Sequence, residues 1–304
     1  MLTVLTWYWR QPGVRTAYEP FHVAIWADMI RRHLTVPHRL AVVTNEPLEI
    51  EGVDIIAPPT DFEAIRIPSW PEHRPQCLRR LVMFRRDAGE IFGDEILCTD
   101  LDLVVGASLD PLLGGADEFR MAIGTAPGRP YNGSLLYLRC GTRSEVYERF
   151  TPEGAAEAGQ SYVGSDQAWI AHCLGPNEAT WGEADGLVYH GLPRQPDTVR
   201  RIEFYPGQTK PWHERNDPWV RRHYRRSPQG QCLVLGYDET LWSDVDAALQ
   251  NGPYDAVIAS PEAAEHWPGQ ILAVARDNAE AARLAHIHGF DDVTWCGVTE
   301  KEAA

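Results

Sequence analysis

The stretch "EILCTDLDLVVGASLDPLL", residues 95–113, places two carboxylates between two apolar runs. Residues 96–99 lead directly into Asp100, and residues 103–105 follow directly after Asp102. Stripping water from an unpaired charge costs much free energy, so carboxylates at the end of a buried strand are expected to have partners. We therefore expect both Asp100 and Asp102 to have partners, supplied by other residues of the chain or by a ligand.

The chain around this stretch alternates strand and helix patterns. Strand patterns cover residues 2–7, 38–45 and 53–59, and helix patterns cover residues 21–34 and 77–92. After residue 113 we expect strands at 119–124 and 134–140 with a loop at 125–133, and helices at 144–150 and 165–174. Ser165 or Asp166 would cap the last helix. This alternation predicts an α/β protein with a mostly parallel sheet and helices on both faces.

The last part of the chain has a pattern of its own. Four short strand patterns lie at 232–236, 254–260, 271–276 and 292–297, with helix patterns at 239–252, 261–269 and 278–290. We therefore predict two domains, a large one over residues 1–228 and a small α/β accessory domain over residues 231–304. No phosphate-binding glycine loop appears in the smaller one, and its role stays open.

Charge and composition narrow the class of protein. A net charge of −15 over 304 residues argues against nucleic-acid binding, because the dominant electrostatic term would be repulsive. No segment reaches the roughly 18 apolar residues of a transmembrane helix, and the start lacks a signal-peptide pattern, so we expect a cytoplasmic protein. The six cysteines include no C-x-x-C pair, which argues against a structural zinc site.

One basic stretch stands out on this acidic chain. Residues 194–226 contain eight arginines and Lys210 against four acidic residues. They could meet an anionic ligand or make a peripheral membrane contact, or they could simply be solvated. Lys210 is itself notable, since the only other lysine is Lys301. A lysine retained in an arginine-rich chain suggests a point-charge role.

The carboxylate pair suggests a metal. Alternate residues of an extended strand share a face, so Asp100 and Asp102 can point the same way, at the end of a strand where α/β sheets bind ligands. Two like charges held close favour a divalent cation. Carboxylate oxygens suit Mg²⁺ or Mn²⁺, which usually bind together with phosphate oxygens. A lone Asp-x-Asp also fits an ordinary strand-end turn with solvated aspartates.

Three later motifs support the prediction of a binding site at Asp100 and Asp102. "YNGSLLYLRCG" (131–141) places Asn and Ser before an apolar strand, "GSDQAWI" (164–170) places Asp-Gln at a helix start, and "FYPGQTKPW" (204–212) contains Gly-x-x-Lys-Pro-Trp. Together with the Asp-x-Asp stretch, in this order and spacing over about residues 1–215, they resemble the GT-A-fold glycosyltransferases of family 8 and related bacterial DxD enzymes. The resemblance implies a nucleotide-diphospho-sugar transferase fold with a Rossmann-like mixed sheet.

The resemblance also implies roles for individual residues. Asp100 and Asp102 would hold Mn²⁺ or Mg²⁺ at the diphosphate of a nucleotide-sugar, a uridine one, and Lys210 would donate to the same phosphates. The acceptor would be a glycan or a lipid-linked glycan, and relatives retain the anomeric configuration. The implied donor-site residues are Thr6, Trp7 and Tyr8 near the base, with Arg80, Asp100, Leu101, Asp102, Asn132, Ser134, Lys210 and Trp212, and the catalytic candidates are Asp166 and Gln167.

One position departs from the family pattern. The late motif usually begins with a histidine that serves as a third metal ligand, and here that position is Phe204. The metal site could be weaker, completed by water, or completed by Glu203 or His190. Each motif residue also has a purely structural interpretation as a turn, a cap or a core aromatic.

Two other functions compete with sugar transfer. "ILCTDLDLV" also fits the nucleophile motif of a haloacid-dehalogenase-like phosphatase, with Asp100 as nucleophile, Asp102 as acid/base and residues 289–293 as a later acidic motif. That motif normally opens its domain, whereas about a hundred residues precede it here. The missing histidine also suggests a non-catalytic nucleotide-sugar binding protein.

Overall fold

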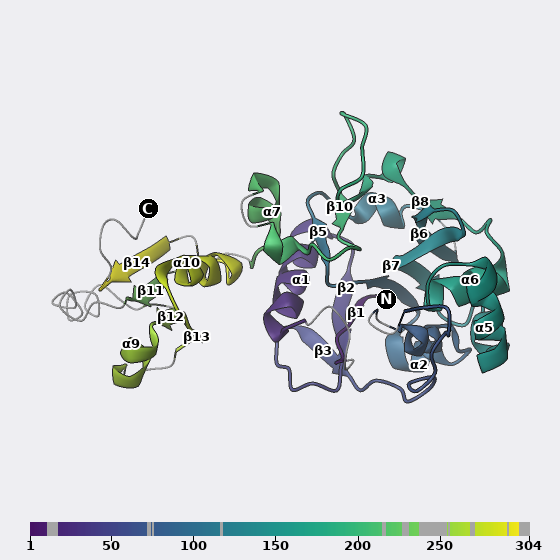
Figure 1. Ribbon diagram of the computed structural model, residues 1–304, viewed down its shortest axis with the longest axis horizontal. Coiled ribbons are helices and arrows are strands. Elements are labelled where there is room, and N and C mark those ends of the chain that lie inside the picture. The colour runs from purple at the N-terminus through teal and green to yellow at the C-terminus, as the bar shows by residue number, and fades with distance from the viewer. Residues whose placement is uncertain are drawn as a thin grey trace. The chain divides into compact units, whose positions relative to one another are not determined.

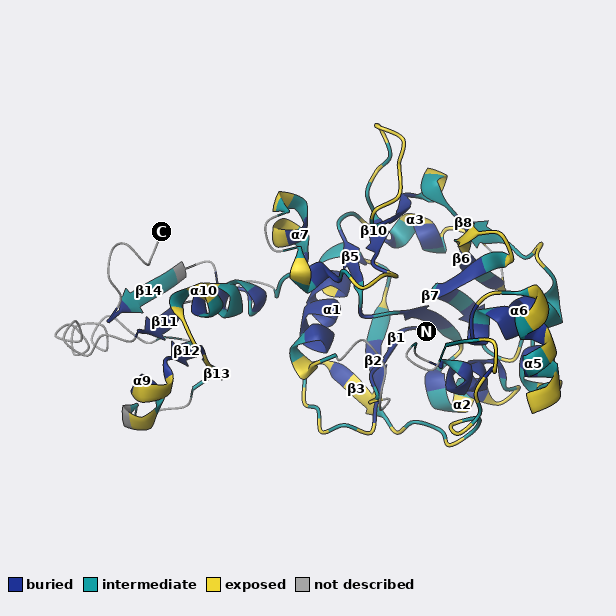
Figure 2. Ribbon diagram, viewed as in Figure 1, coloured by how far each residue is buried: buried dark blue, intermediate teal, exposed yellow. Residues whose placement is uncertain are grey.

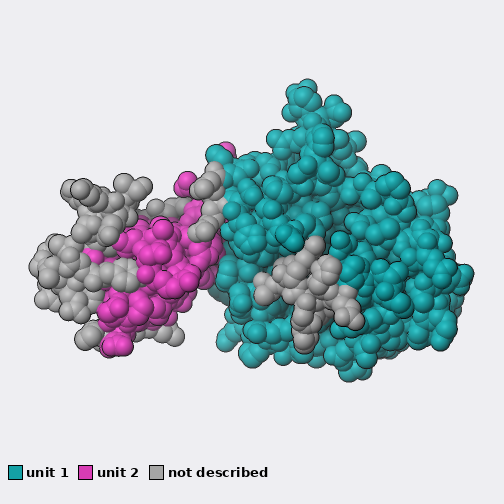
Figure 3. Space-filling model, in the orientation of Figure 1, with its two compact units in different colours: residues 1–220 teal, residues 221–304 magenta. Residues whose placement is uncertain are grey.

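The computed structural model forms two compact units, Met1–Val220 and Arg221–Ala304 (Figure 1, Figure 3). We had predicted the boundary at residues 228–231. The structure describes residues 1–10, 18–71, 74, 76–115, 118–214, 217–226, 231–236, 254, 256–267, 271–290 and 292–297.

The first unit is built on a seven-stranded mixed sheet in the order β3-β2-β1-β4-β7-β6-β8. Its first four strands in this order are parallel, β7 runs antiparallel to both β4 and β6, and β8 runs parallel to β6. The predicted α/β fold with a mixed sheet is therefore confirmed. The strands are β1 (Leu2–Trp7), β2 (His38–Val43), β3 (Val53–Ile56), β4 (Glu95–Thr99), β6 (Phe119–Ala126), β7 (Arg129–Arg139) and β8 (Thr180–Trp181).

A second, three-stranded sheet continues from the Asp-x-Asp segment. It has the order β5-β10-β9 and consists of β5 (Leu103–Val105), β9 (Leu187–Tyr189) and β10 (Ile202–Phe204). The α-helices are α1 (Pro20–His33), α2 (Ala88–Phe92), α3 (Asp110–Leu113), α4 (Glu145–Glu148), α5 (Pro152–Ser161), α6 (Asp166–Leu174) and α7 (Pro218–His223). Three 3₁₀ helices join them, η1 (Leu78–Phe84), η2 (Glu183–Asp185) and η3 (Pro211–His213).

Helices cover both faces of the large sheet, and the buried residues follow the sheet (Figure 2). On one face the strands pack against η1, α2, α5 and α6 through a shared apolar cluster that includes Phe84, Phe92 and Trp169. On the other face α1 lies against the sheet, where Trp26 Nε1 donates a 2.7 Å hydrogen bond to Thr99 Oγ1. Strand β1 is buried at every position, as expected for a strand covered on both faces.

Two predicted elements differ from the structure. Residues 77–92 were predicted as one helix, but Arg85 is extended (φ −62°, ψ 148°) and separates η1 from α2. Residues 125–133 were predicted as a loop, but only Pro127 and Gly128 form the turn, and β7 begins at Arg129. Strand β4 pairs with β7 only as far as Leu135, so residues 129–133 have β6 on one side and an open edge on the other. Pro130 is tolerated there because that edge has no ladder to complete.

The second unit has a parallel four-stranded sheet in the order β13-β12-β11-β14. Its elements are β11 (Gln231–Leu235), β12 (Ala256–Ala259), α9 (Pro261–His266), β13 (Ala273–Val274), α10 (Asn278–Ile287) and β14 (Asp292–Cys296). The helix predicted over residues 239–252 lies outside the described residues. Across the described part of the chain, no helix has the length and apolarity to cross a membrane.

The hydrogen bond between Trp26 and Thr99 gives a test of this packing. Replacing Thr99 by Val keeps the shape but leaves the buried Trp26 N–H without its acceptor, so the free energy of unfolding should fall by about 1–3 kcal/mol. Urea denaturation followed by tryptophan fluorescence measures the change. Thr60→Val, at an exposed position, is the control and should stay within about 0.5 kcal/mol of wild type. Equal stability of Thr99→Val and wild type would contradict the packing role.

Candidate functional site

A cavity of about 500 Å³ opens where β1 and β4 end, beside the open edge of β7. It brings together side chains from all four sequence motifs, although these are spread over more than a hundred residues of chain. The lining residues are Trp7, Trp9, Tyr18, Trp70, Arg74, Cys77, Arg80, Asp100, Leu101, Asp102, Arg129, Asn132, Gly133, Ser134, Ser165, Asp166, Gln167, Pro206, Gly207 and Lys210.

Arg80 connects three walls of this cavity. Its side chain, only 5% exposed, projects from η1 and donates 2.8 Å to Asp100 Oδ1 and 2.5 Å to the Gly133 carbonyl oxygen. Its Nε lies 3.5 Å from Asp166 Oδ2, an ion pair without a hydrogen bond. Burial works to lower the pKa of Arg80, but its neighbours Cys98, Asp100 and Asp166 raise that pKa well above its usual value. Arg80 is therefore a permanent cation that joins the Asp-x-Asp segment, β7 and α6.

Asp100 and Asp102 are each paired with a different cation. Asp100 pairs with Arg80, and its carboxylate is 31% exposed. Burial raises the pKa of Asp100 and the nearby Asp102 adds to the rise, while Arg80 and a hydrogen bond with Ser134 act against it. Lys210 Nζ donates 2.5 Å to Asp102 Oδ2 and 2.9 Å to the Tyr205 carbonyl oxygen. The partners that the sequence required are thus supplied by the chain itself.

The backbone of the Asp-x-Asp segment differs from the expected strand. Residues 100–102 form a bend between β4 and β5. The Asp100 N–H donates to the Ser134 carbonyl oxygen at 3.1 Å, and the Tyr205 N–H donates to the Asp102 carbonyl oxygen at 3.0 Å. Both aspartates line the cavity because these two neighbouring segments hold the bend, and not because strand alternation places them there.

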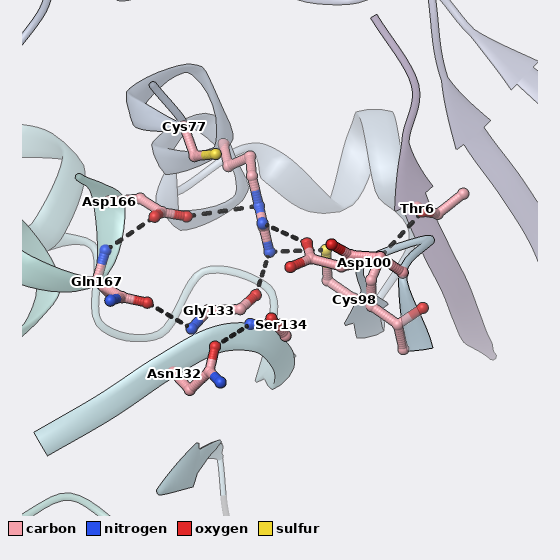
Figure 4. Close-up of polar contacts among 12 residues, drawn as sticks. Thr6, Cys77, Cys98, Asp100, Asn132, Gly133, Ser134, Asp166 and Gln167 are labelled. Carbon is pink, nitrogen blue, oxygen red and sulfur yellow. Dashed lines mark hydrogen bonds and ion pairs between the residues drawn. The ribbon is translucent and has the colours of Figure 1, made fainter. Parts of the chain in front are cut away.

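The Asp-Gln motif is held against β7 by hydrogen bonds with backbone groups. Gln167 Oε1 accepts from the Gly133 N–H at 3.0 Å, and its Nε2 donates to the Val163 carbonyl oxygen at 3.1 Å. Asp166 Oδ1 accepts from the Gln167 N–H at 2.9 Å. These contacts can be followed in Figure 4, where the Gln167 side chain points to Gly133 and the Asp166 carboxylate lies beside the Gln167 N–H. The amide of Gln167 is therefore fixed in orientation before any ligand binds.

Glycine is required at position 164, two residues before Asp166. Gly164 has φ +140°, and a Cβ there would lie 2.4 Å from Gln167 Cγ. Any other residue would push Gln167 from its place on β7. Ser165 stands at the N-cap of α6 but makes no capping hydrogen bond with its side chain, which instead accepts from the Cys77 N–H at 3.0 Å. Ser165 thus ties α6 to η1 rather than capping the helix as predicted.

Several predicted donor-site residues lie behind the cavity wall. Trp7 lines the cavity, but Thr6 and Tyr8 do not. Thr6 points to the opposite face of β1, where its Oγ1 donates 2.9 Å to the Thr99 carbonyl oxygen. Trp212 also lies outside the lining, with its ring 4.1 Å from His22 and 5.9 Å from Tyr18, which does line the cavity. The remaining predicted site residues all line the cavity.

A divalent ion would find two carboxylates here and no third protein ligand. Within the described residues no group of three or more His, Cys, Asp or Glu side chains could hold a metal. Phe204 is buried in β10, where its ring lies 5.1 Å from Tyr189. His190 and Glu203 pair with one another at 3.1 Å, and neither lines the cavity. Asp100 and Asp102 still suit Mg²⁺ or Mn²⁺, which often bind through one or two carboxylates with waters and substrate phosphates.

The structure adds cavity residues that the motifs did not indicate. Trp70 and Arg74 come from the proline-rich segment before η1, Arg129 from the start of β7, and Trp9 and Tyr18 from either side of residues 11–17. None of them stands in an apolar pattern or a recognisable motif. In the sequence, only the high number of tryptophans, eleven in the chain, indicated that aromatic side chains could line a site.

Comparisons with known proteins find remote similarity to solved structures and no match by sequence. No protein-family profile and no curated protein matches the sequence. Among solved structures the chain is similar to the galactosyltransferase LgtC in complex with donor and acceptor sugar analogs, with 14% identity and a TM-score of 0.47 over 72% of this chain and 93% of that one. It is similar to the glycosyltransferase GlyE of Streptococcus pneumoniae TIGR4 (13% identity, TM-score 0.44, 96% and 79% covered) and to the bifunctional glycosyltransferase WbbM (14%, 0.42, 69% and 46%).

The contacts of Arg80 predict a large loss of stability when it is removed. Arg80→Met leaves Asp100 and Asp166 without their cation in a mostly buried place, so the free energy of unfolding should fall by about 3–5 kcal/mol. The loss should be largest near neutral pH and shrink as the pH falls, because burial raises the pKa of Asp100 and protonation of its carboxylate removes an uncompensated charge.

Urea denaturation at several pH values measures this effect. Arg86→Met is the matched control, since Arg86 is 75% exposed and pairs with Glu148 at the surface, and it should cost at most about 1 kcal/mol. A loss for Arg80→Met that is small, or that does not vary with pH, would contradict the structural role of the Arg80 ion pairs.

Proposed function

We propose that this protein is a glycosyltransferase that moves a sugar from a nucleotide-sugar, a UDP-sugar, to a glycan or lipid-linked acceptor with the help of a divalent cation. The observation that supports this most is the single cavity into which Asp100, Asp102, Gln167 and Lys210 converge. Four motifs that resemble one enzyme family in sequence would have no reason to share a cavity if each were only a turn, a cap or a core residue.

The donor would bind along the Asp-x-Asp side of the cavity. Trp7 and Trp9, whose ring centroids lie 5.6 Å apart, offer aromatic surface for a base or a sugar ring. Asp100 and Asp102 would hold Mn²⁺ or Mg²⁺. When bound, the cation would neutralise negative charge that develops on the leaving diphosphate.

A cationic side chain of the protein, Lys210, would also stabilise the negative charge on the leaving diphosphate. Lys210 lies 2.5 Å from Asp102, so its ammonium is at the edge of the metal site and could donate to a diphosphate oxygen. Arg80 is held by hydrogen bonds to Asp100 and Gly133 and by an ion pair with Asp166, so it is not free to do the same. Its part is to orient Asp100 and Asp166, and the buried ion pairs keep both carboxylates in place without reorganisation.

Sugar and acceptor would be positioned by β7 and α6. Asn132 lies on the open edge of β7 and Ser134 follows it beside Asp100, while Asp166 and Gln167 begin α6 on another wall of the same cavity. The three carboxylates of the lining, Asp100, Asp102 and Asp166, are all paired with a cation. An inverting transferase needs a carboxylate or other base ready to take the acceptor proton. The absence of an uncommitted carboxylate from the described lining favours transfer with retention of configuration.

We propose that the protein works in the cytoplasm. An anionic acceptor or membrane surface could meet the arginines of residues 221–226, of which Arg221 and Arg222 are exposed. We keep the second unit as an accessory domain without an assigned role.

Calorimetric titration with UDP tests the donor site. Wild type should bind UDP in the micromolar range when Mn²⁺ is present and at least about tenfold more weakly without it, because the cation would join the diphosphate to Asp100 and Asp102. Asp102→Asn should lose the metal dependence. Asp94→Asn, at a carboxylate that is 85% exposed and far from the cavity lining, is the control and should behave as wild type.

The products released from nucleotide-sugars separate the three candidate functions. A transferase releases UDP, a phosphatase using Asp100 releases inorganic phosphate from phosphate esters, and a binding protein releases neither. Absence of UDP binding under every condition would contradict the proposal, whatever the products.

The proposed stereochemistry has a measurement of its own. Transfer should give a product whose new glycosidic bond has the same anomeric configuration as the sugar in the donor. The coupling constant of the anomeric proton, followed by NMR from the earliest turnover, reports this configuration. A product of opposite configuration would contradict retention and would require a base outside the three paired carboxylates.

A further inference from the structure

Two arginines in the cavity are left unused by the proposed donor site. Arg74 and Arg129 both line the cavity, and both guanidinium groups lie over the ring of Trp70, 4.9 Å and 6.0 Å from its centroid. We define these three residues as the arginine–tryptophan cluster. It is formed by the proline-rich segment before η1 and the first residue of β7, elements that are separate from the Asp-x-Asp bend and η3.

Among the described residues, no acidic side chain compensates the charges of this cluster. No carboxylate of the described residues forms an ion pair with Arg74 or Arg129, and the buried Nε atom of each has no hydrogen-bond partner there. The pKa of Arg129 is lowered by burial and then by the charge of Arg74, while only Tyr189 acts to raise it. The two cations therefore repel one another in a partly buried place, which is unfavourable unless a ligand supplies negative charge.

The rest of the cavity cannot supply that charge. Its lining contains four cations and three carboxylates, and all three carboxylates are paired with Arg80 or Lys210. The cavity is thus positive at the arginine–tryptophan cluster although the whole chain carries a net charge of −15. Surface arginines would be solvated or paired, as Arg86 is with Glu148, whereas these two are held by the Trp70 ring within a cavity.

The cluster adjoins the proposed sugar pocket. Arg129 and Asn132, one of the residues proposed to contact sugar, both belong to β7 and both line the cavity. A guanidinium presents parallel donors that match the two oxygens of a carboxylate or phosphate, and the Trp70 face suits a sugar ring. The cluster therefore combines recognition of an anion with recognition of a ring.

We propose that Arg74, Arg129 and Trp70 form a subsite for an anionic sugar, one that bears a carboxylate or a phosphate. This inference rests on the proposed function, since it names the class of sugar that the same cavity selects. The anionic sugar is either the one transferred from the donor or the one that accepts it, and the two sources can be distinguished by experiment.

Binding of matched charged and neutral sugars tests the proposal. The full chain is titrated in the calorimeter with UDP-glucuronate against UDP-glucose in one arm, and with glucuronate or glucose 6-phosphate against glucose in the other. Wild type should prefer the charged ligand in at least one arm by about tenfold or more, as expected for hydrogen bonds between charged groups. Preference in the first arm assigns the anion to the transferred sugar, and preference in the second assigns it to the acceptor.

Variants connect the preference to the cluster. Arg74→Gln and Arg129→Gln should each reduce the preference severalfold, and the double variant should abolish it, while Arg74→Lys should keep part of it. Arg86→Gln is the matched control at an exposed arginine. Urea denaturation of each variant confirms that it is folded.

Three results would overturn the subsite. Wild type could bind charged and neutral sugars alike in both arms, or the preference could survive the double variant. Alternatively, the same substitutions could weaken binding of UDP itself, which would assign the arginines to the diphosphate. Failure of the proposed function is distinguishable, because it would remove UDP binding from wild type while the second arm, run without UDP, would still report on the anionic sugar.

Discussion

The site depends on the burial of one guanidinium. Arg80 cannot lose its proton at any ordinary pH, so its place inside the first unit requires acidic or polar partners. Those partners come from the bend after β4, the open edge of β7 and the first turn of α6, three segments that are distant in sequence. One ion-pair centre therefore holds Asp100, the Asn-Gly-Ser segment and the Asp-Gln motif in one arrangement before any ligand binds.

The same arrangement limits how a metal could act. Asp100 and Asp102 are already neutralised by Arg80 and Lys210, and no third carboxylate or imidazole of the described residues joins them. Two paired carboxylates hold a cation weakly by themselves, since the ion must share them with existing charges. Under the proposed function, a large share of the affinity would come from the diphosphate that arrives with the ion. Phe204 is compatible with such a site, because its ring belongs to the core between β9 and β10.

Some features of the fold followed from the sequence and others did not. Strands with continuous apolar runs, such as β1 and β4, were located correctly because burial on both faces leaves an unmistakable pattern. The break at Arg85 was missed because residues on both sides of it have helical apolar spacing, and the extended Arg85 backbone has no sequence signature. The start of β7 was missed because Pro130 and Gly133 are typical turn residues, and only the absence of a β4 neighbour makes a strand possible there.

The sequence by itself determined the α/β architecture, the order of the motifs and the need of Asp100 and Asp102 for partners, because these depend on local pattern and on the cost of burying charge. Which partners they have was decided by the tertiary structure, since Arg80 and Lys210 reach them from distant segments. Tertiary structure also decided that Trp7 lines the cavity while Thr6 faces away, and that Arg74 and Arg129 meet on one tryptophan. Contacts between residues far apart in the chain depend on how sheets and loops pack, and no local pattern encodes them.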